Sequence, residues 1–176
     1  MTTGNLLSGK TALVTGAGRG LGRAFAEHLA SMGCSVGVHG MREDGPSEYG
    51  EGTTLTNTAY EIAENAGVRT VPVLADLTQS NQIDRIVAEV ETQLGEIDVL
   101  VHNAGGDIAA SGGKPDPNDC VLIKEEDIRA VLDRNLLSTI LVCQRVARSM
   151  MERREGRIIT ISSIAAFIGR GHTSIY

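Results

Sequence analysis

The chain has 176 residues, a length typical of about one domain with a hydrophobic core of its own. A net charge of -6 and an aromatic content of 3% argue against nucleic acid as a partner, because phosphate binding needs a basic face and base stacking needs aromatic rings. The first ten residues have no apolar leader segment, and no apolar run approaches the ~20 residues that span a bilayer, so we expect a cytoplasmic protein without a membrane partner.

The first half of the chain alternates short apolar runs with helical patterns. The run TALVT at 11–15 is typical of a buried strand, and a helical pattern follows it until Gly33. The stripe that should face the core in that helix consists of Leu21, Phe25, His28, Leu29 and Met32. The next predicted elements are a strand at 35–39, a loop rich in Gly and acidic residues at 41–53, a helix at about 54–66 and a strand at 69–74.

The second half repeats the alternation with longer helices. One helix has an apolar stripe of Ile83, Ile86, Val87, Val90 and Leu94, and it ends at Gly95. A longer helix has Ile128, Leu132, Asn135, Thr139, Val142, Val146 and Met150 near one face. The other predicted elements are a strand at 97–102, a long Gly/Pro/Asp loop at 105–119 and a strand at 157–162.

Five repetitions of strand and helix predict an α/β fold, a doubly wound parallel sheet with helices on both faces. Pro72 lies inside the third strand, and proline is tolerated in a sheet only at an edge. The strand order 3-2-1-4-5 puts the third strand at an edge, so we expect this Rossmann-like order. Residues 1–176 are interpreted as a single dinucleotide-binding domain that lacks its C-terminal strands and helices.

A glycine-rich segment, TGAGRGLG at 15–22, connects the first strand to its helix. Glycines let the backbone turn tightly and approach a phosphate, and the start of the helix offers N–H groups and a positive dipole end to an anion. The alternative is a tight turn chosen only for packing. A phosphate-binding P-loop does not fit, because no G-K-[ST] follows the glycines.

The spacing T-G-x-x-x-G-x-G resembles that of the short-chain dehydrogenase/reductase family, and further motifs match it in order. HNAG at 102–105 is similar to the family's N-N-A-G, with His102 in place of the first Asn. Asp76 follows the third strand, Asn135 lies in RNLLST, and Tyr176 comes thirteen residues after Ser163. The resemblance covers the chain from about residue 8 to its end and is closest to 3-oxoacyl-(acyl-carrier-protein) reductase-like members.

The resemblance implies a hydride transfer between a nicotinamide and a carbonyl or alcohol carbon of a small molecule. Tyr176 would be the acid or base for the substrate oxygen, Ser163 would hydrogen-bond that oxygen, and Asn135 would order a water in a proton relay. Two plainer readings stay open. Ser163 could satisfy local backbone at a strand end, and Asn135 could be a packed, satisfied amide.

The family's Y-x-x-x-K motif would place its lysine at position 180, beyond the last residue of this chain. We therefore expect the chain to be a fragment that is weakly active or inactive by itself. The alternatives are a nucleotide-binding module without catalysis and a methyltransferase, which also has a glycine-rich loop after its first strand. The combination of HNAG with Ser163 and Tyr176 disfavours the methyltransferase.

NADP is the favoured cofactor, with NAD as the alternative. The position where an acid would bond the ribose 2′-OH is about Gly40, whereas Arg19 and Arg42 suit a 2′-phosphate; Glu43 and Asp44 lie near enough to favour NAD instead. We expect no metal site, since Cys34, Cys120 and Cys143 fit no zinc pattern, and the family implies a homodimer or homotetramer. The expected cofactor-binding residues are Gly16, Arg19, Gly20, Leu21, Gly22, Arg42, Asp76, Leu77, Asn103, Ala104 and Gly105.

Overall fold

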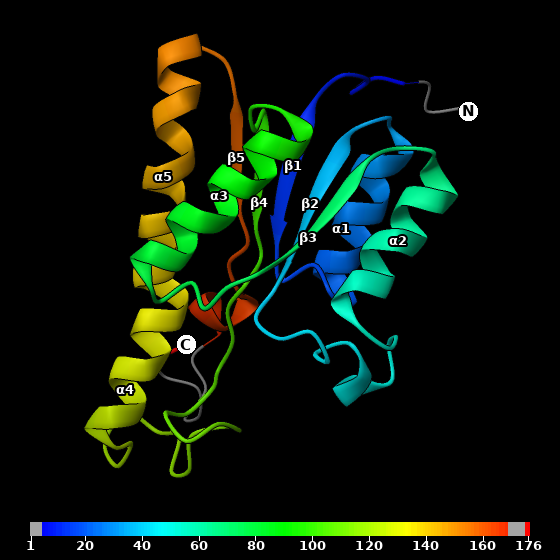
Figure 1. Cartoon of the computed structure of the whole chain (residues 1–176). Coiled ribbons are helices and arrows are strands. Elements are labelled where there is room, and N and C mark those ends of the chain that lie inside the picture. The colour runs from blue at the N-terminus through cyan, green and yellow to red at the C-terminus, as the bar shows by residue number, and fades with distance from the viewer. Residues whose placement is uncertain (1–4, 169–174) are drawn as a thin grey trace.

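The computed structural model describes residues 5–168 and 175–176. A five-stranded parallel sheet lies between two helical layers, with α1 and α2 on one face and α3 and α5 on the other (Figure 1). The elements are β1 (Thr11–Thr15), α1 (Gly20–Ser31), β2 (Ser35–Gly40), η1 (Ser47–Tyr49), α2 (Leu55–Ala66), β3 (Thr70–Leu74), α3 (Ser80–Leu94), β4 (Val99–His102), α4 (Glu125–Leu132), η2 (Asp133–Leu137), α5 (Ser138–Arg153), β5 (Arg157–Thr160) and η3 (Ile164–Phe167).

The strand order is β3-β2-β1-β4-β5, which confirms the order predicted from the sequence. Pro72 lies in β3 beside Val38 of β2, and β3 is an edge strand. Proline has no N–H to donate, and at the edge that missing donor costs no ladder hydrogen bond. Because all five strands are parallel, their carboxyl ends point to the same side of the molecule. The loops that follow β1, β2 and β4 meet there.

The two faces of the sheet bury separate hydrophobic clusters. All five residues of the stripe predicted for α3 are buried, in a cluster with Leu13 of β1 and Leu100 of β4. The opposite cluster contains Val14, Val36 and Val38 with residues of α1 and α2. The central strands are covered on both faces, as their continuously apolar sequences predicted.

The stripe predicted for α1 is right only in part: Phe25 and Leu29 are partly buried and pack against the core. Leu21 and His28 are exposed, whereas Gly22, Ala26 and Ala30 are buried against the sheet. These small residues, spaced four apart, let α1 approach β1 closely, so large side chains would not fit between them.

The long helix predicted before the last strand is interrupted by a π-helical turn, η2. Val131 and Ser138 are buried, and Leu132, expected on the core face, is exposed. A π-turn takes one more residue than an α-turn, so a constant α-helical spacing does not stay on one face across it. The stripe is right again in α5, where Val142, Val146 and Met150 are buried.

β5 lies at the other edge of the sheet, paired with β4 alone among the described strands. Its side chains are exposed on both faces, with Ile158 39% and Ile159 49% accessible. β5 thus differs from the central strands, and the described residues place no neighbouring strand beyond it. None of the described helices is long and apolar enough to cross a membrane.

Candidate functional site

The glycine-rich loop lies between the end of β1 and the start of α1, and each of its glycines meets a different structural requirement. A Cβ at Gly22 would lie 2.0 Å from the carbonyl oxygen of Gly16, so only glycine fits this contact. Gly16 has a φ of +66° and lies against Asn103 and Ala104. Gly20 has a φ of +54°, and a Cβ there would meet nothing within 4 Å. Gly20 therefore puts no side chain over the N-terminus of α1, as a phosphate-binding turn requires.

Thr15 joins this loop to the HNAG segment after β4. Its buried hydroxyl accepts the backbone N–H groups of Asn103 (3.1 Å) and Ala104 (3.0 Å), and it lies 3.1 Å from Nδ1 of His102. A threonine hydroxyl that accepts twice has its own proton left to donate, so Nδ1 of His102 is the acceptor. Neutral His102 then carries its proton on Nε2, which is buried and has no hydrogen-bond partner within the described part of the chain.

His39 is a second buried histidine, on β2, whose structural role sequence reasoning missed. Gly16 donates its N–H to Nδ1 (3.1 Å), and Nε2 lies 3.1 Å from the carbonyl oxygen of Ala75. Because Nδ1 accepts, Nε2 must carry the proton and donate it to Ala75. A polar residue near the end of an otherwise apolar buried strand is the signal that could have revealed this contact. No group of three His, Cys, Asp or Glu able to hold a metal occurs among the described residues.

Burial is the main cause that lowers the pKa of His39 from 6.5 to about 4; the hydrogen bond to Ala75 opposes this shift, and the nearby His102 adds to it. The folded state thus favours the neutral ring, and the unfolded chain binds more protons between about pH 6.5 and pH 4. We expect the free energy of unfolding to fall as the pH is lowered through that window and to level off below it. His39→Gln removes the titration, so about 2–3 kcal/mol of the loss should disappear. Urea unfolding at pH 7.5 to 4.5 measures it.

The control for this prediction is His28→Gln, because His28 is exposed in the last turn of α1. The loss of stability that is due to His39 should remain in this variant. His102 keeps part of the dependence in the His39 variant, since burial lowers the pKa of His102 to about 4 as well. If the free energy of unfolding fell equally with pH in the wild type and in His39→Gln, the role given to the His39 ring would be contradicted.

The end of β2 is tightly packed at Gly40, so a side chain there would require Leu55 to shift. A Cβ there would come within 3.0–3.1 Å of both methyl groups of Leu55. Glu43, an alternative source of a carboxylate, accepts the backbone N–H of Thr56 (3.0 Å) at the start of α2. Hydrogen bonds from the side chain of Thr56 and then from its backbone lower the pKa of Glu43. Arg42 forms ion pairs with Glu48 and, at 3.6 Å, with Asp44. The acids near β2 therefore lie against α2 and Arg42.

The other residues expected to bind a cofactor also lie at the carboxyl ends of the strands. Asp76 accepts the backbone N–H and the hydroxyl of Thr78 (3.0 and 2.8 Å), which shapes the turn before α3. Leu77 is buried in the core, so it can offer a ligand only its backbone. Asn103 donates from Nδ2 to the carbonyl oxygen of Gly16, at 3.4 Å. Leu21 is exposed beside the open turn.

Asn135 lies in the π-turn and spans the loop after β4. Its Oδ1 accepts the N–H of Gly106 (2.8 Å), and its Nδ2 donates to the carbonyl oxygens of Gly106 (2.9 Å) and Val131 (2.8 Å). A Cβ at Gly105 would lie 2.5 Å from Oδ1, which explains the glycine at that position. The amide itself is thus satisfied by backbone, as the plainer reading of the sequence had it.

Ser163 and Tyr176 lie on the same side of the sheet as the glycine loop, but no hydrogen bond joins them among the described residues. Ser163 follows β5, and its Oγ accepts the N–H of Ala165 (3.1 Å) at the start of η3. Tyr176 is exposed, and the segment that leads to it, 169–174, lies outside the described residues. Figure 1 shows the C-terminal end near the carboxyl ends of the strands.

The sequence and the fold both match one family. The family model described as short chain dehydrogenase matches residues 10–176, so the chain belongs to the short-chain dehydrogenase/reductase family. It is 34% identical over 171 residues to cyclohexanol dehydrogenase of Rhodococcus sp. strain TK6 and 34% identical over 168 residues to the 3-oxoacyl-(acyl-carrier-protein) reductase FabG of Escherichia coli strain K12. These alignments cover 94% and 96% of this chain but 60% of each relative, so the chain spans about three-fifths of their length.

Solved structures share the fold and name two nicotinamide cofactors. Actinorhodin polyketide ketoreductase with NADPH has a TM-score of 0.80 and 31% identity, covering 95% of this chain and 58% of that one. The 7α-hydroxysteroid dehydrogenase complexed with NADH and 7-oxo glycochenodeoxycholic acid has a TM-score of 0.79 and 26% identity, covering 100% and 62%. The family and the Rossmann-like fold predicted from the sequence are confirmed.

Proposed function

We propose that the protein is an NAD(P)-dependent oxidoreductase that transfers a hydride between a nicotinamide and the carbonyl or alcohol carbon of a small molecule. The observation that carries the proposal is the open turn at Gly20, at the start of α1 and at the carboxyl end of β1. Doubly wound sheets bind dinucleotides at this place. The NADPH and NADH in the two solved relatives support the cofactor class.

The residues around the turn fit a dinucleotide. Backbone N–H groups at Gly20 and Leu21 would hold the pyrophosphate, because the first amides of a helix have no partner within the helix. Arg19 and Arg42 would contact a 2′-phosphate, and Asp76 would lie beside the adenine. Ala104 and Gly105, placed by Thr15 and by Asn135, would line the path toward the substrate side.

When bound, the cofactor supplies or accepts the hydride. As negative charge develops on the substrate oxygen, Ser163 donates a hydrogen bond to it, since a hydroxyl that accepts from Ala165 can still donate its own proton. Tyr176 delivers the proton in reduction and takes it in oxidation. Asn135 holds the Gly105–Gly106 backbone through its amide, and its place in the π-turn supports a role beside the relay, because π-turns are common at functional sites.

The test is consumption of NADPH by the full-length protein over a panel of ketones, aldehydes, acyl thioesters and keto-sugars. We expect turnover with at least one class, its loss in Tyr176→Phe and its retention in Tyr60→Phe, which changes an exposed tyrosine of α2. Binding without turnover on any class would favour a nucleotide-binding module instead. The 176-residue chain assayed beside the full-length protein tests whether this part has activity by itself.

We expect NADPH to bind more tightly than NADH. The reasons are the two arginines beside the turn and the absence of an acid at position 40, where Gly40 packs tightly against Leu55. A charge-assisted contact contributes roughly 1.5–3 kcal/mol, so the preference should be about ten-fold or more. Fluorescence titration with both cofactors measures it. Arg19→Ala and Arg42→Ala should reduce the preference, and Arg129→Ala, at an exposed pair on α4, should not; equal affinities in the wild type would contradict the assignment.

A homodimer or homotetramer remains part of this proposal. Exposed apolar side chains along η2 and α5 support it, because such a stripe on a helix is suited to pack against a second copy. Sedimentation of the full-length protein measures the assembly state. The residues of the stripe are Leu136, Ile140 and Met151.

A further inference from the structure

The N-terminus of α1 already holds an anion, and it comes from the chain itself. Oε2 of Glu51 accepts the backbone N–H of Gly20 at 2.6 Å. Gly20 is the first residue of α1, and its N–H has no partner within the helix. The N-cap residue, Arg19, makes no side-chain capping bond, and the first turn contains no acid. Glu51 therefore supplies the negative charge that the helix dipole favours at this end.

Glu51 belongs to the segment 41–53, called the strap here, which connects β2 to α2. Arg23, in the first turn of α1, donates to the Glu51 carbonyl oxygen (3.1 Å) and is itself held by ion pairs with Glu27 and Glu61 (both 2.8 Å). The Glu51 N–H donates to the carbonyl oxygen of Pro46 (3.1 Å). Both hydrogen bonds place the Glu51 backbone over the start of α1.

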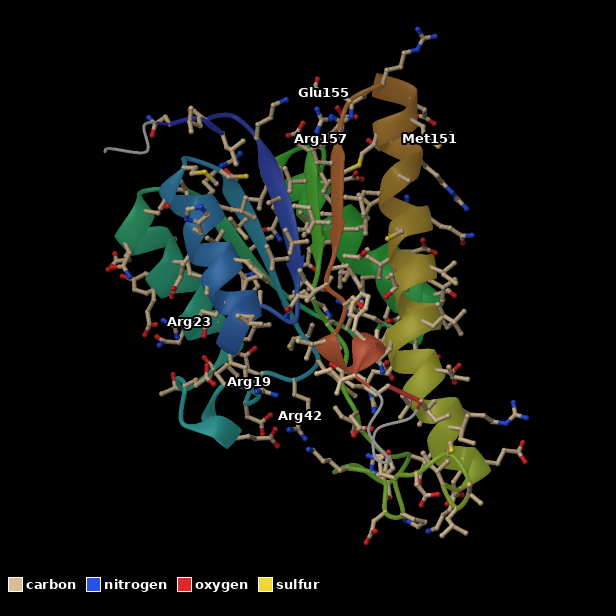
Figure 2. The ribbon with its side chains drawn as sticks, turned by 180° about the vertical axis from the view of Figure 1, so that it is seen from behind. Arg19, Arg23, Arg42, Met151, Glu155 and Arg157 are labelled. Atoms are coloured by element: carbon tan, nitrogen blue, oxygen red, sulfur yellow. The ribbon has the colours of Figure 1, made fainter. Side chains whose placement is uncertain are left out.

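The strap also packs on the glycine loop itself. Pro46 is buried, and a Cβ at Gly18 would lie 3.4 Å from its ring and 3.2 Å from Leu55. Two more acids of the strap, Asp44 and Glu48, pair with Arg42. Figure 2 shows Arg19, Arg23 and Arg42 at the same end of the molecule, next to this segment. The strap thus brings carboxylates to the groups proposed for the cofactor's phosphates.

We propose that the strap is an internal competitor for the cofactor: the Glu51 carboxylate occupies the phosphate-binding end of α1 and leaves when a pyrophosphate binds there. The inference rests on the proposed function, because it takes the glycine loop to be the cofactor site. A carboxylate and a phosphate oxygen both need the Gly20 N–H, and two anions at one helix end repel each other. The free energy that holds Glu51 on Gly20 is thereby subtracted from cofactor binding, and Glu51 sets the affinity without touching the bound ligand.

The decisive variant is Glu51→Gln, which keeps the shape of the side chain and removes its charge. We expect it to bind NADPH, NADH and inorganic pyrophosphate about two- to five-fold more tightly than the wild type, as expected for loss of a solvent-exposed competing anion. Adenosine, which has no phosphate, should bind equally to both. The association rate should rise more than the dissociation rate changes, since the strap must open before the phosphates bind.

Glu64→Gln is the matched control, because it makes the same charge change on α2, where the Glu64 side chain bonds Tyr60. It should leave all the affinities unchanged, and circular dichroism should show the same fold for each variant. Unchanged or weaker pyrophosphate binding in Glu51→Gln, with NADPH still bound, would overturn the competition and leave the cofactor site standing. Absence of NADPH and NADH binding in every variant would instead overturn the proposed function, and the strap's role with it.

Discussion

Gly20→Val should abolish cofactor binding while the fold persists. A side chain at residue 20 would project into the open space at the start of α1, where the pyrophosphate is proposed to lie. If two charge-assisted hydrogen bonds of roughly 1.5–3 kcal/mol each are lost, the affinity should fall by about a hundred-fold or more. Titration with NADPH measures the affinity, and circular dichroism reports the fold.

The φ of +54° at Gly20 adds a separate cost, because a side chain in the left-handed region is strained by about 1–2 kcal/mol. Gly67→Val separates the two effects. Gly67 ends α2 with a φ of +66°, and a Cβ there also meets nothing within 4 Å, so the variant has similar strain away from the loop. It should be destabilised to a similar degree and still bind NADPH. If Gly20→Val also kept its affinity, the glycine loop would be only a turn.

Ser163→Ala should lower kcat of the full-length protein by about 10²–10³, the usual cost of removing one hydrogen-bond donor to a developing oxyanion. KM should change much less, because the hydrogen bond strengthens as charge develops on the substrate oxygen. The substitution also removes the acceptor for the Ala165 N–H at the start of η3. Thermal unfolding of the variant measures separately how much stability the loss of this hydrogen bond costs.

Ser162→Ala is the neighbouring control and should keep most of the activity. The thirteen-residue spacing to Tyr176 favours Ser163, and the structure gives Ser163 the position that caps η3. A large loss of kcat in Ser162→Ala with little change in Ser163→Ala would exchange the two roles. If both variants kept the activity of the wild type, neither serine would take part in the proposed chemistry.

Sequence reasoning predicted the features that depend on local patterns. Pro72 predicted the edge strand, and the five apolar residues of α3 predicted its buried face, because both follow from backbone chemistry and periodicity. The stripe of α1 was right only for Phe25 and Leu29, because full burial there depends on how closely the helix approaches the sheet, which favours small residues such as Ala26. The sequence pattern of the long helix contained no signal for the π-turn at η2.

The candidate site shows the same division. The glycine positions follow from the spacing of the motif, and the structure adds why each is glycine. The contacts of His39 with Gly16 and of Glu51 with Gly20 join residues 23 and 31 positions apart. Such contacts depend on strand register and on the path of the strap, so a local pattern could mark His39 as an unusual polar residue in a buried strand but could not identify the partner of either residue. The hydrogen bond between the Asn135 amide and the Gly106 backbone likewise joins residues that are far apart in the sequence.

The exposed isoleucines of β5 determine how the 176-residue chain can be handled in solution. An edge strand with unpaired N–H and C=O groups and apolar side chains on both faces is a template for pairing with another chain. Pro72 blunts the opposite edge, whereas β5 has one charged residue, Arg157 at its start, and no proline beside Ile158 and Ile159. Self-association of this chain by itself should therefore begin at β5, and assays of it belong at low protein concentration, where edge-to-edge aggregation is slowest.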